Sequence, residues 1–192
     1  MSKLAIAIIY GSTRENRYGI RLSYLISNLL NKRGNDTTIV DPMDYNLPTL
    51  NKRYADYKNG SAPKNLEKLH NILDASDSFV LVSGEYNHFP PPALINLLDH
   101  FSPEYYRKPS AVCTYSTGDF AGIRVQTPLR AFLAQLGTPP IRESFHQPNI
   151  NKSLLENGEP TSEKNIHIRF NLFAEEIEWY SKVLREGRKK EL

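Results

Sequence analysis

The sequence predicts a single doubly wound α/β domain built on a parallel sheet. Short apolar runs of strand length alternate with longer segments in which apolar residues recur at helical spacing. This alternation repeats five times without a linker or a second core. A chain of 192 residues also suits one domain. The whole sequence, residues 1–192, is therefore expected to form one domain.

The first part of the chain reads as strand, helix, strand. Residues 4–9 (LAIAII) form an apolar run of strand length, as expected for a strand covered on both faces. A polar segment follows, and from Ile20 an apolar stripe of helical period continues until Gly34. Residues 36–41 (DTTIVD) are rich in β-branched side chains and predict a second strand. This order predicts a parallel pair with a right-handed crossover.

The middle of the chain contains a long irregular segment and a third strand. Residues 42–63 hold several prolines and glycines, and a loop of this length in a compact domain is usually functional or mobile. Residues 64–75 have a helical pattern, and residues 79–83 (FVLVS) form the third strand. The polar loop GEYNH then leads into a proline-led helix over residues 90–101, since proline is tolerated in a first helical turn.

The last part repeats the pattern and ends in a basic tail. The expected elements are a strand at 110–115, a polar loop at 116–122, a helix at 123–136, a weaker strand at 139–145, a polar segment at 146–162 and a helix at 163–188. Cationic residues gather at the C-terminal end of this helix, where they complement its dipole, and a solvated helix end is expected.

Composition limits the classes of function. The net charge of +3 fits an anionic small ligand and is too small to indicate nucleic-acid binding. No stretch approaches the ~20 apolar residues that cross a bilayer, so no membrane partner is expected. The single cysteine, Cys113, lies in an apolar run and predicts a buried inert thiol in a reducing, cytoplasmic setting. No metal site is expected, and His100 is placed at a helix surface or an interface.

The loop after the first strand has the chemistry of a phosphate cradle. It places a glycine, two hydroxyls, Arg14 and Arg17 between a buried strand and a helix N-terminus. It lacks both the Gly-Lys-Ser/Thr of a Walker loop and the G-x-G-x-x-G dinucleotide fingerprint. The alternative is a helix cap with solvated arginines. Asp41 ends the second strand, where a ribose-binding acid would lie in a dinucleotide fold.

Three loops of this fold would meet in one crevice. In the strand order 2-1-3-4-5 the first and third strands are neighbours, and ligands bind at the carboxyl ends of the strands beside such a switch point. A monophosphate in the first loop and a flat polar ring between the second and third loops predict FMN. Backbone N–H groups at the start of the Ile123 helix would stabilise negative charge on reduced flavin. Arg124 would add to this field or form a surface ion pair.

Three segments carry a resemblance to a known family. These are GSTRENRYG (11–19), GEYNHFPPPALINLLDHF (84–101) and YSTGDFAGIRVQTPLRAFLAQLG (115–137). Over about residues 4–137 the chain resembles the NADPH-dependent FMN reductases and related quinone and azo reductases of the flavodoxin-like superfamily. The resemblance implies a flavodoxin-like three-layer sandwich. It also implies three groups of cofactor-binding residues: Ser12, Arg14, Arg17, Gly19 and Ile20 at the phosphate; Glu85, Tyr86, Asn87 and His88 beside the isoalloxazine; and Ser116, Thr117 and Gly118 at its pyrimidine edge.

The same resemblance implies an activity. NADPH or NADH would give a hydride to the flavin, and a flavin, quinone or azo-type acceptor would then take two electrons. No side chain is needed as a nucleophile, and Tyr86 and His88 are candidate contacts with the acceptor. The alternatives are a flavin-binding redox-sensing regulator with incidental turnover and, less favoured by the basic pI, an electron carrier.

Family members are homodimers or homotetramers, and interface residues are proposed on this basis. The apolar candidates, which the core could equally use, are Leu94, Leu98, Phe101, Leu129 and Phe132. Tyr105, Tyr106 and residues 42–63 are candidates for completing the pocket of a partner subunit. The chain departs from the family pattern at Gly84, which replaces the usual proline, and at His88–Phe89, so these positions are expected to set substrate preference.

Overall fold

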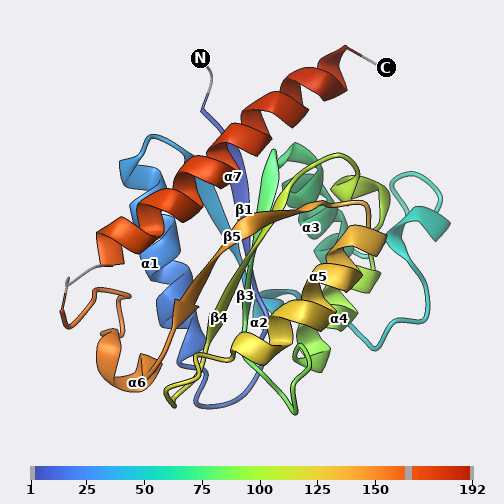
Figure 1. Ribbon diagram of the computed structural model, residues 1–192. Helices are drawn as coiled ribbons and strands as arrows, with labels where there is room; N and C mark the ends of the chain where they lie inside the picture. Colours follow the sequence, from blue (N-terminus) through green and yellow to red (C-terminus); the bar gives the residue numbers. More distant parts are fainter. Residues whose placement is uncertain (1–2, 163–165, 191–192) are drawn as a thin grey trace.

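The protein is a three-layer sandwich around a five-stranded parallel sheet. The computed structural model describes residues 3–162 and 166–190. The strands lie in the order β2-β1-β3-β4-β5 (Figure 1). Their bounds are β1 Ala5–Tyr10, β2 Asp36–Val40, β3 Ser78–Ser83, β4 Ser110–Tyr115 and β5 Pro140–Gln147. The predicted fold class and strand order are confirmed.

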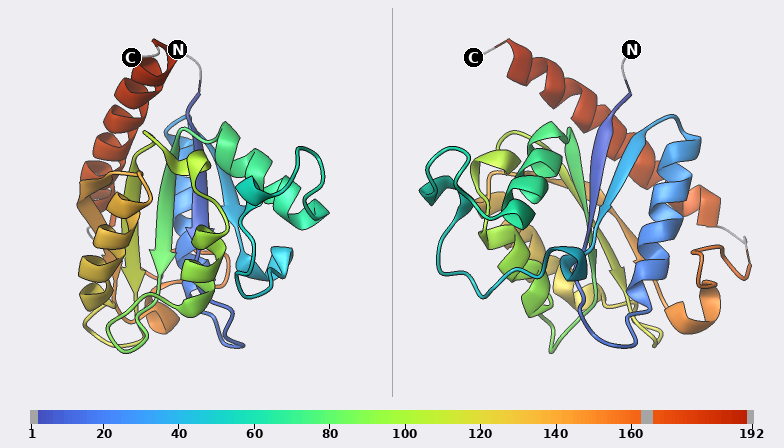
Figure 2. Two further views of the ribbon diagram at one scale, coloured as in Figure 1. Left: turned by 90° about the vertical axis from the view of Figure 1, so that its right-hand side faces the viewer. Right: turned by 180° about the vertical axis from the view of Figure 1, so that it is seen from behind.

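Two hydrophobic cores cover the two faces of the sheet. Strand side chains alternate between them: Ile6 and Ile8 belong to one core, and Ala7 and Ile9 to the other. The first core is completed by α1 (Gly19–Lys32) and α7 (Ile166–Lys189), and the second by α3 (Lys64–Ala75), α4 (Pro92–Asp99) and α5 (Gln126–Gln135). Figure 1 and the rear view in Figure 2 show this separation. Burial on both faces explains why the strands are continuous apolar runs.

Residues 42–63, expected to be irregular, contain two short helices. Asp41 accepts a hydrogen bond from the Met43 N–H and caps α2 (Pro42–Tyr45). Tyr54 begins the 3-10 helix η1 (Tyr54–Asp56), and its ring stacks on His70 with centroids 4.1 Å apart. The Tyr54 N–H also donates to the His100 carbonyl at 2.8 Å. These contacts attach the segment to the domain at Asp41–Tyr45 and at Tyr54, while most residues from 51 to 60 are exposed.

Several predicted boundaries need correction. The helix expected from Ile123 is a 3-10 turn, η3 (Ile123–Val125), followed by α5. The weak fifth strand is real and extends to Gln147. The helix α6 (Ile150–Ser153) lies within the predicted polar segment 146–162, and η2 (Pro103–Tyr105) lies between α4 and β4, where no element was predicted. The start predicted for the last helix, residues 163–165, lies outside the described residues.

The basic end of α7 is an ion-pair clasp rather than a solvated tail. Arg185 Nη1 lies 3.1 Å from Asp77 Oδ2, and Arg188 Nη2 lies 3.2 Å from Asp77 Oδ1. The same carboxylate accepts the Ala5 N–H at 3.0 Å. The expectation of solvation was wrong for these two arginines, because their partner precedes β3 and is more than 100 residues away in sequence.

The apolar residues considered for an interface belong mainly to the core. Four of them are buried within the second core: Leu94, Leu98, Phe101 and Leu129. Phe132 is partly buried against the same cluster. His100 was expected at a helix surface or an interface but is also buried, with Nδ1 2.7 Å from the Asn96 carbonyl. No helix among the described residues is long and apolar enough to span a membrane.

Candidate functional site

Three loops gather at the carboxyl ends of β1, β3 and β4, at the end of the sheet opposite the chain termini (Figure 1). We call them loop 1 (residues 11–18), loop 2 (residues 84–91) and loop 3 (residues 116–122). Loop 1 is joined to β3 by the Gly11 N–H, which donates to the Val82 carbonyl at 3.0 Å. The predicted meeting of these loops is thus present, because β1 and β3 are adjacent.

Ser12 is the anchor of loop 1. Its side chain is buried, with an exposed fraction of 2%. Its hydroxyl accepts the Arg14 N–H at 3.3 Å and lies 3.1 Å from the Tyr86 hydroxyl of loop 2. Tyr86 also carries the Arg14 guanidinium 5.6 Å from its ring centroid. Loops 1 and 2 are therefore held together by this serine, arginine and tyrosine.

Loop 1 presents backbone donors that the chain itself does not use. Within the described part of the chain, the N–H groups of Ser12, Thr13 and Asn16 have no hydrogen-bond acceptor. They precede the N-terminus of α1, whose first turn contains no acidic residue. Free N–H groups beside the positive end of a helix dipole are the donor set of an anion site. The phosphate-cradle interpretation fits this geometry.

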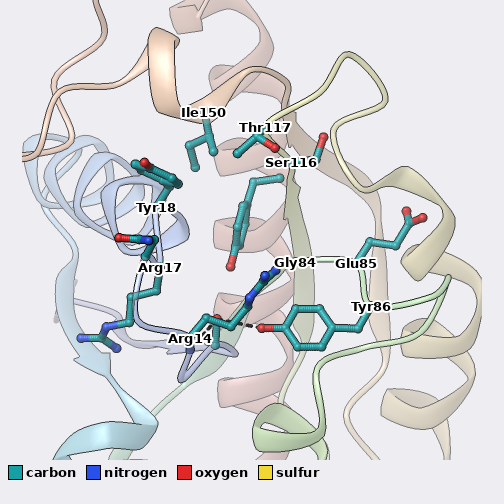
Figure 3. A pocket seen from close by; sticks show the side chains of 12 residues that line it. Arg14, Arg17, Tyr18, Gly84, Glu85, Tyr86, Ser116, Thr117 and Ile150 are labelled. Carbon is teal, nitrogen blue, oxygen red and sulfur yellow. Dashed lines mark hydrogen bonds between the residues drawn. The ribbon is translucent and has the colours of Figure 1, made fainter.

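The two arginines of loop 1 differ in what they contact. The Arg17 guanidinium points away from the pocket in Figure 3, and its Nη1 lies 2.6 Å from Asp41 Oδ1. Asp41 thus pairs with Arg17 and caps α2, which is a structural use of this carboxylate and not a ribose site. Arg14 remains exposed beside Tyr86. Arg14 is consequently the guanidinium available to an anion in the pocket.

Loop 2 contains a tight turn with two strained residues. Tyr86 and Phe89 exchange both backbone hydrogen bonds, at 2.9 and 3.0 Å. Asn87 and His88, between them, have φ of 51° and 68°. Positive φ at both central positions is the geometry of a type I′ turn, which Asn tolerates better than His. The turn lifts Asn87, His88 and the 64% exposed Phe89 out of the pocket wall.

Glu85 connects loop 2 to the residues that follow loop 3. It accepts the Arg124 N–H at 3.1 Å and forms an ion pair with the Arg124 guanidinium at 3.6 Å. His88 Nε2 lies 4.0 Å from the same carboxylate. Arg124 was expected either to add to the field at the flavin or to form a surface ion pair, and it forms an ion pair with Glu85. The Arg124 N–H, expected among the donors to reduced flavin, is used by Glu85.

The first residue of loop 3, Ser116, is held by β5 and α6. The Ser116 N–H donates to the Gln147 carbonyl at 3.3 Å, and the Ile150 N–H donates to the Ser116 carbonyl at 3.0 Å. At its other end, Gly122 has φ of 66°, and a Cβ there would lie 2.6 Å from the Tyr115 carbonyl oxygen. Glycine is required at this position, where the loop turns back over the end of β4.

A pocket with a volume of about 150 Å³ opens between the three loops (Figure 3). Seven predicted site residues line it: Ser12, Arg14, Arg17, Glu85, Tyr86, Ser116 and Thr117. Five others do not: Gly19, Ile20, Asn87, His88 and Gly118. Gly84, which was expected to influence substrate preference, also lines the pocket, together with four residues that were not predicted: Asn16, Tyr18, Tyr115 and Ile150. Tyr18 and Ile150 lie opposite Tyr86 in Figure 3.

Tyr115 contributes a largely buried wall of this pocket. A Cβ at Gly19 would overlap its ring, and one at Gly84 would lie 3.2 Å from its hydroxyl. Gly19 is thus needed for the close packing of α1 on Tyr115. The Tyr115 hydroxyl donates to the Tyr10 hydroxyl at 3.3 Å. Burial raises the pKa of both tyrosines, so both hydroxyls are neutral. Its position in the sequence, at the end of a predicted strand and before a polar loop, could have identified Tyr115 as a pocket residue.

Comparison with protein families gives one match. The model of a family described as NADPH-dependent FMN reductase matches residues 4–152, which include all three loops. A search of curated proteins finds no match.

Comparison with solved structures finds flavoproteins of the same fold. The flavoenzyme NAD(P)H:(acceptor) oxidoreductase FerB from Paracoccus denitrificans superimposes with a TM-score of 0.71 at 21% identity, covering 93% of this chain and 98% of that one. An NADH:FMN oxidoreductase, EMOB, gives 0.62 at 14% identity, covering 94% and 90%. Flavodoxin 1 from Bacillus cereus gives 0.54 at 15% identity, covering 90% and 96%. At these low identities, the superpositions show that the proteins share a fold.

Proposed function

Because the chain belongs to the NADPH-dependent FMN reductase family, we propose that it is an FMN-dependent NAD(P)H oxidoreductase. The observation that carries the proposal is the convergence of an anion cradle in loop 1 with the polar turns of loops 2 and 3 at the β1/β3 switch point. In this fold, a ligand with a phosphate at one end and a planar polar ring at the other suits such a site.

The phosphate of FMN would bind in loop 1. The N–H groups of Ser12, Thr13 and Asn16 have no acceptor in the described chain, and Arg14 is the unpaired guanidinium beside them. The pocket has a volume of about 150 Å³ and is open to solvent on one side. This space suits a phosphate with part of the ribityl chain. The ring system would lie at the mouth, between Tyr86 and Thr117.

Loops 2 and 3 would position the ring rather than react with it. When bound, FMN supplies a two-electron carrier between a reduced nicotinamide and an acceptor. Ser116 and Thr117 offer hydroxyl and backbone groups on one side, and Glu85 and Tyr86 form the other side. Because Glu85 is held by Arg124, the distance between the two sides is fixed before ligand binds. A preorganised pocket lowers the cost of ordering the ligand.

The acceptor would approach from the side of the exposed turn in loop 2. His88 is exposed and lies near Glu85, so it is placed to donate a proton or a hydrogen bond to a quinone, azo or flavin acceptor. Phe89 and Phe120, 64% and 68% exposed, are at the tips of loops 2 and 3 and would contact a planar acceptor. NADPH and NADH remain equal candidates for the reductant. A homodimer or homotetramer and a reducing, cytoplasmic setting complete the proposal.

The deciding experiment measures flavin binding and turnover in one preparation. The purified protein should show flavin absorbance or bind added FMN, and it should oxidise NADPH or NADH with FMN, a quinone or an azo dye as acceptor. A protein that binds no FMN would contradict the proposal. Bound FMN without turnover would favour a redox-sensing regulator, and reduction by dithionite in two separate one-electron steps would favour an electron carrier.

A further inference from the structure

A hydrogen-bonded chain of four side chains lies behind loop 3. Thr114 ends β4, His146 lies in β5, and Gln126 and Arg130 belong to α5. His146 Nδ1 lies 2.7 Å from Thr114 Oγ1, and His146 Nε2 lies 2.6 Å from Gln126 Nε2. Gln126 Oε1 accepts from Arg130 Nε at 3.1 Å, and Thr114 Oγ1 donates to the Ala121 carbonyl at 2.7 Å.

The direction of every bond in this chain is fixed by the chemistry at its two ends. Arg130 can only donate, so Gln126 must receive it through its carbonyl oxygen and present its amide N–H to His146. His146 Nε2 must then accept and carry no proton. At the other end, Thr114 gives its one proton to the Ala121 carbonyl, so Thr114 must accept a proton from His146 Nδ1. Only the neutral Nδ1–H tautomer of His146 satisfies all four side chains.

This series of hydrogen bonds ends at the Ala121 carbonyl, in the strained part of loop 3. Ala121 has φ of 52° and is followed by Gly122 with φ of 66°. An alanine in this region is conformationally unfavourable and persists only when its surroundings hold it. Two residues later, Arg124 gives its N–H to Glu85 of loop 2. The Thr114–Ala121 bond therefore sits where loop 3 turns back and connects to loop 2.

We propose that His146 is a positioning residue for the pocket: its neutral Nδ1–H form supports loop 3 through Thr114, and protonation at Nε2 weakens this support. The role at the flavin rests on the proposed function. Protonated Nε2 would point its N–H at the Gln126 amide, which cannot accept while its oxygen binds Arg130. The protonated ring keeps its Nδ1–H, so the clash is relieved in one of two ways. The ring moves away from Gln126 and weakens its bond to Thr114, or the Gln126 amide turns and gives up its bond with Arg130. His146 does not line the pocket and acts only through loop 3.

The charges around His146 favour its neutral form. Arg130 faces it from α5, and Arg169 of α7 donates to its backbone carbonyl at 3.1 Å. The nearby carboxylates, Glu143 of β5 and Glu176 of α7, are linked through the Glu143 N–H and act on Arg130. Burial, then Arg169 and Arg130, lowers the pKa of His146 below its ordinary 6.5. The unfolded chain therefore takes up this proton first, and stability falls as the pH drops below 6.5.

The first test needs no flavin. Long-range ¹H–¹⁵N spectra of the flavin-free protein with labelled histidine should show the Nδ1–H tautomer for the resonance that disappears in His146→Asn. On acidification, the Gly118 and Gly122 amide resonances should shift with the midpoint of His146, and this shift should be absent in His146→Asn. Three results would overturn the proposal. They are an Nε2–H tautomer of His146, a His146 titration midpoint at or above the ordinary 6.5, and Gly118 and Gly122 amide resonances that do not shift as His146 titrates.

The second test compares two variants by FMN binding. Asn can place an amide N–H near the position of Nδ1 without titrating, whereas Leu cannot donate. At about pH 8, His146→Leu should bind FMN about threefold to tenfold more weakly, the loss of one net hydrogen bond, and His146→Asn should bind nearly as tightly as the wild type. Toward about pH 5, wild-type affinity should fall more steeply than that of His146→Asn.

Comparing the wild type with the two variants separates the effect of His146 on FMN affinity from that of other groups that titrate in the same pH range. The FMN phosphate, with a pKa of about 6, and His88 are common to wild type and both variants. Equal pH profiles of wild type and His146→Asn, or unchanged affinity of His146→Leu, would contradict the positioning role. If the wild-type protein binds no FMN at about pH 8, the proposed function fails, while the flavin-free spectra still decide whether His146 holds loop 3.

Discussion

The Tyr86 hydroxyl lies 3.1 Å from the Ser12 hydroxyl and so joins two loops that are 74 residues apart in the sequence. The same Ser12 oxygen accepts the Arg14 N–H, and the same Tyr86 ring carries the Arg14 guanidinium. A change in either side chain should consequently disturb both loops. This coupling is the basis of the first prediction.

Ser12→Ala and Tyr86→Phe should each weaken FMN binding about threefold to tenfold, equivalent to roughly 0.5–1.5 kcal/mol for a hydrogen bond. Because the two hydroxyls share one bond, the double variant should lose less than the sum of the two single losses. Fluorescence titration of FMN into the four proteins completes the cycle. Strict additivity would show that the bond does not organise the site.

Arg14→Ala and Arg17→Ala should separate binding from stability. Arg14→Ala should reduce FMN affinity by about 1.5–3 kcal/mol, the range for hydrogen bonds to charged groups, with little change in Tm. Riboflavin, which lacks the phosphate, should bind the variant and the wild type equally. Arg17→Ala should lower Tm because it leaves the Asp41 carboxylate, 10% exposed, without its partner. Equal FMN affinity of wild type and Arg14→Ala would contradict the phosphate assignment.

Gly122→Ala should destabilise the protein, while Gly118→Ala in the same loop should not. At Gly122 the new Cβ would meet the Tyr115 carbonyl oxygen at 2.6 Å, and φ is 66°. The left-handed conformation alone costs about 1–2 kcal/mol for a residue with a Cβ. A Cβ at Gly118 meets nothing within 4 Å. Urea unfolding measures both changes, and equal stability of the two variants would count against the geometry of loop 3.

Asp77→Asn should lower the free energy of unfolding by about 1.5–3 kcal/mol, since Arg185 and Arg188 both bond this carboxylate. The sheet is also involved, because Asp77 accepts the Ala5 N–H of β1. Glu186→Gln is the matched control on the same helix: its exposed pair with Lys189 should leave Tm unchanged. A Tm for Asp77→Asn equal to that of the control would show that the clasp does not stabilise α7.

Cys113 should be unreactive toward an aromatic disulfide reagent until the protein unfolds. The thiol is fully buried in β4, and burial raises its pKa far above the ordinary range, so no thiolate forms at neutral pH. Thiol release should appear only after denaturant is added, with the same midpoint as unfolding. Reaction in buffer alone would mean that β4 opens locally.

Most of the helices and strands could be predicted because they depend on local pattern. The helix predicted at 64–75 is α3 without any shift, and the strand at 110–115 is β4. The short helices between residues 42 and 56 were missed because their stability comes from capping by Asp41 and stacking on His70. Such contacts connect residues that no periodicity relates. Two other wrong expectations, at the α7 tail and at His100, have the same origin.

What the sequence alone determined is the α/β fold class and the three polar loops that make the pocket, whereas the strand order was an expectation carried by the resemblance to a flavodoxin-like family. Apolar periodicity and the polar residues at strand ends suffice for the fold class and the loops, since parallel strands present their carboxyl ends at one edge. Only the tertiary structure decided which side chains face the ligand. Arg14 and Arg17 are three residues apart, yet one lies beside Tyr86 and the other is paired with Asp41. Which arginine faces the ligand depends on partners, Tyr86 and Asp41, that only folding brings near loop 1, so the local sequence does not predict it.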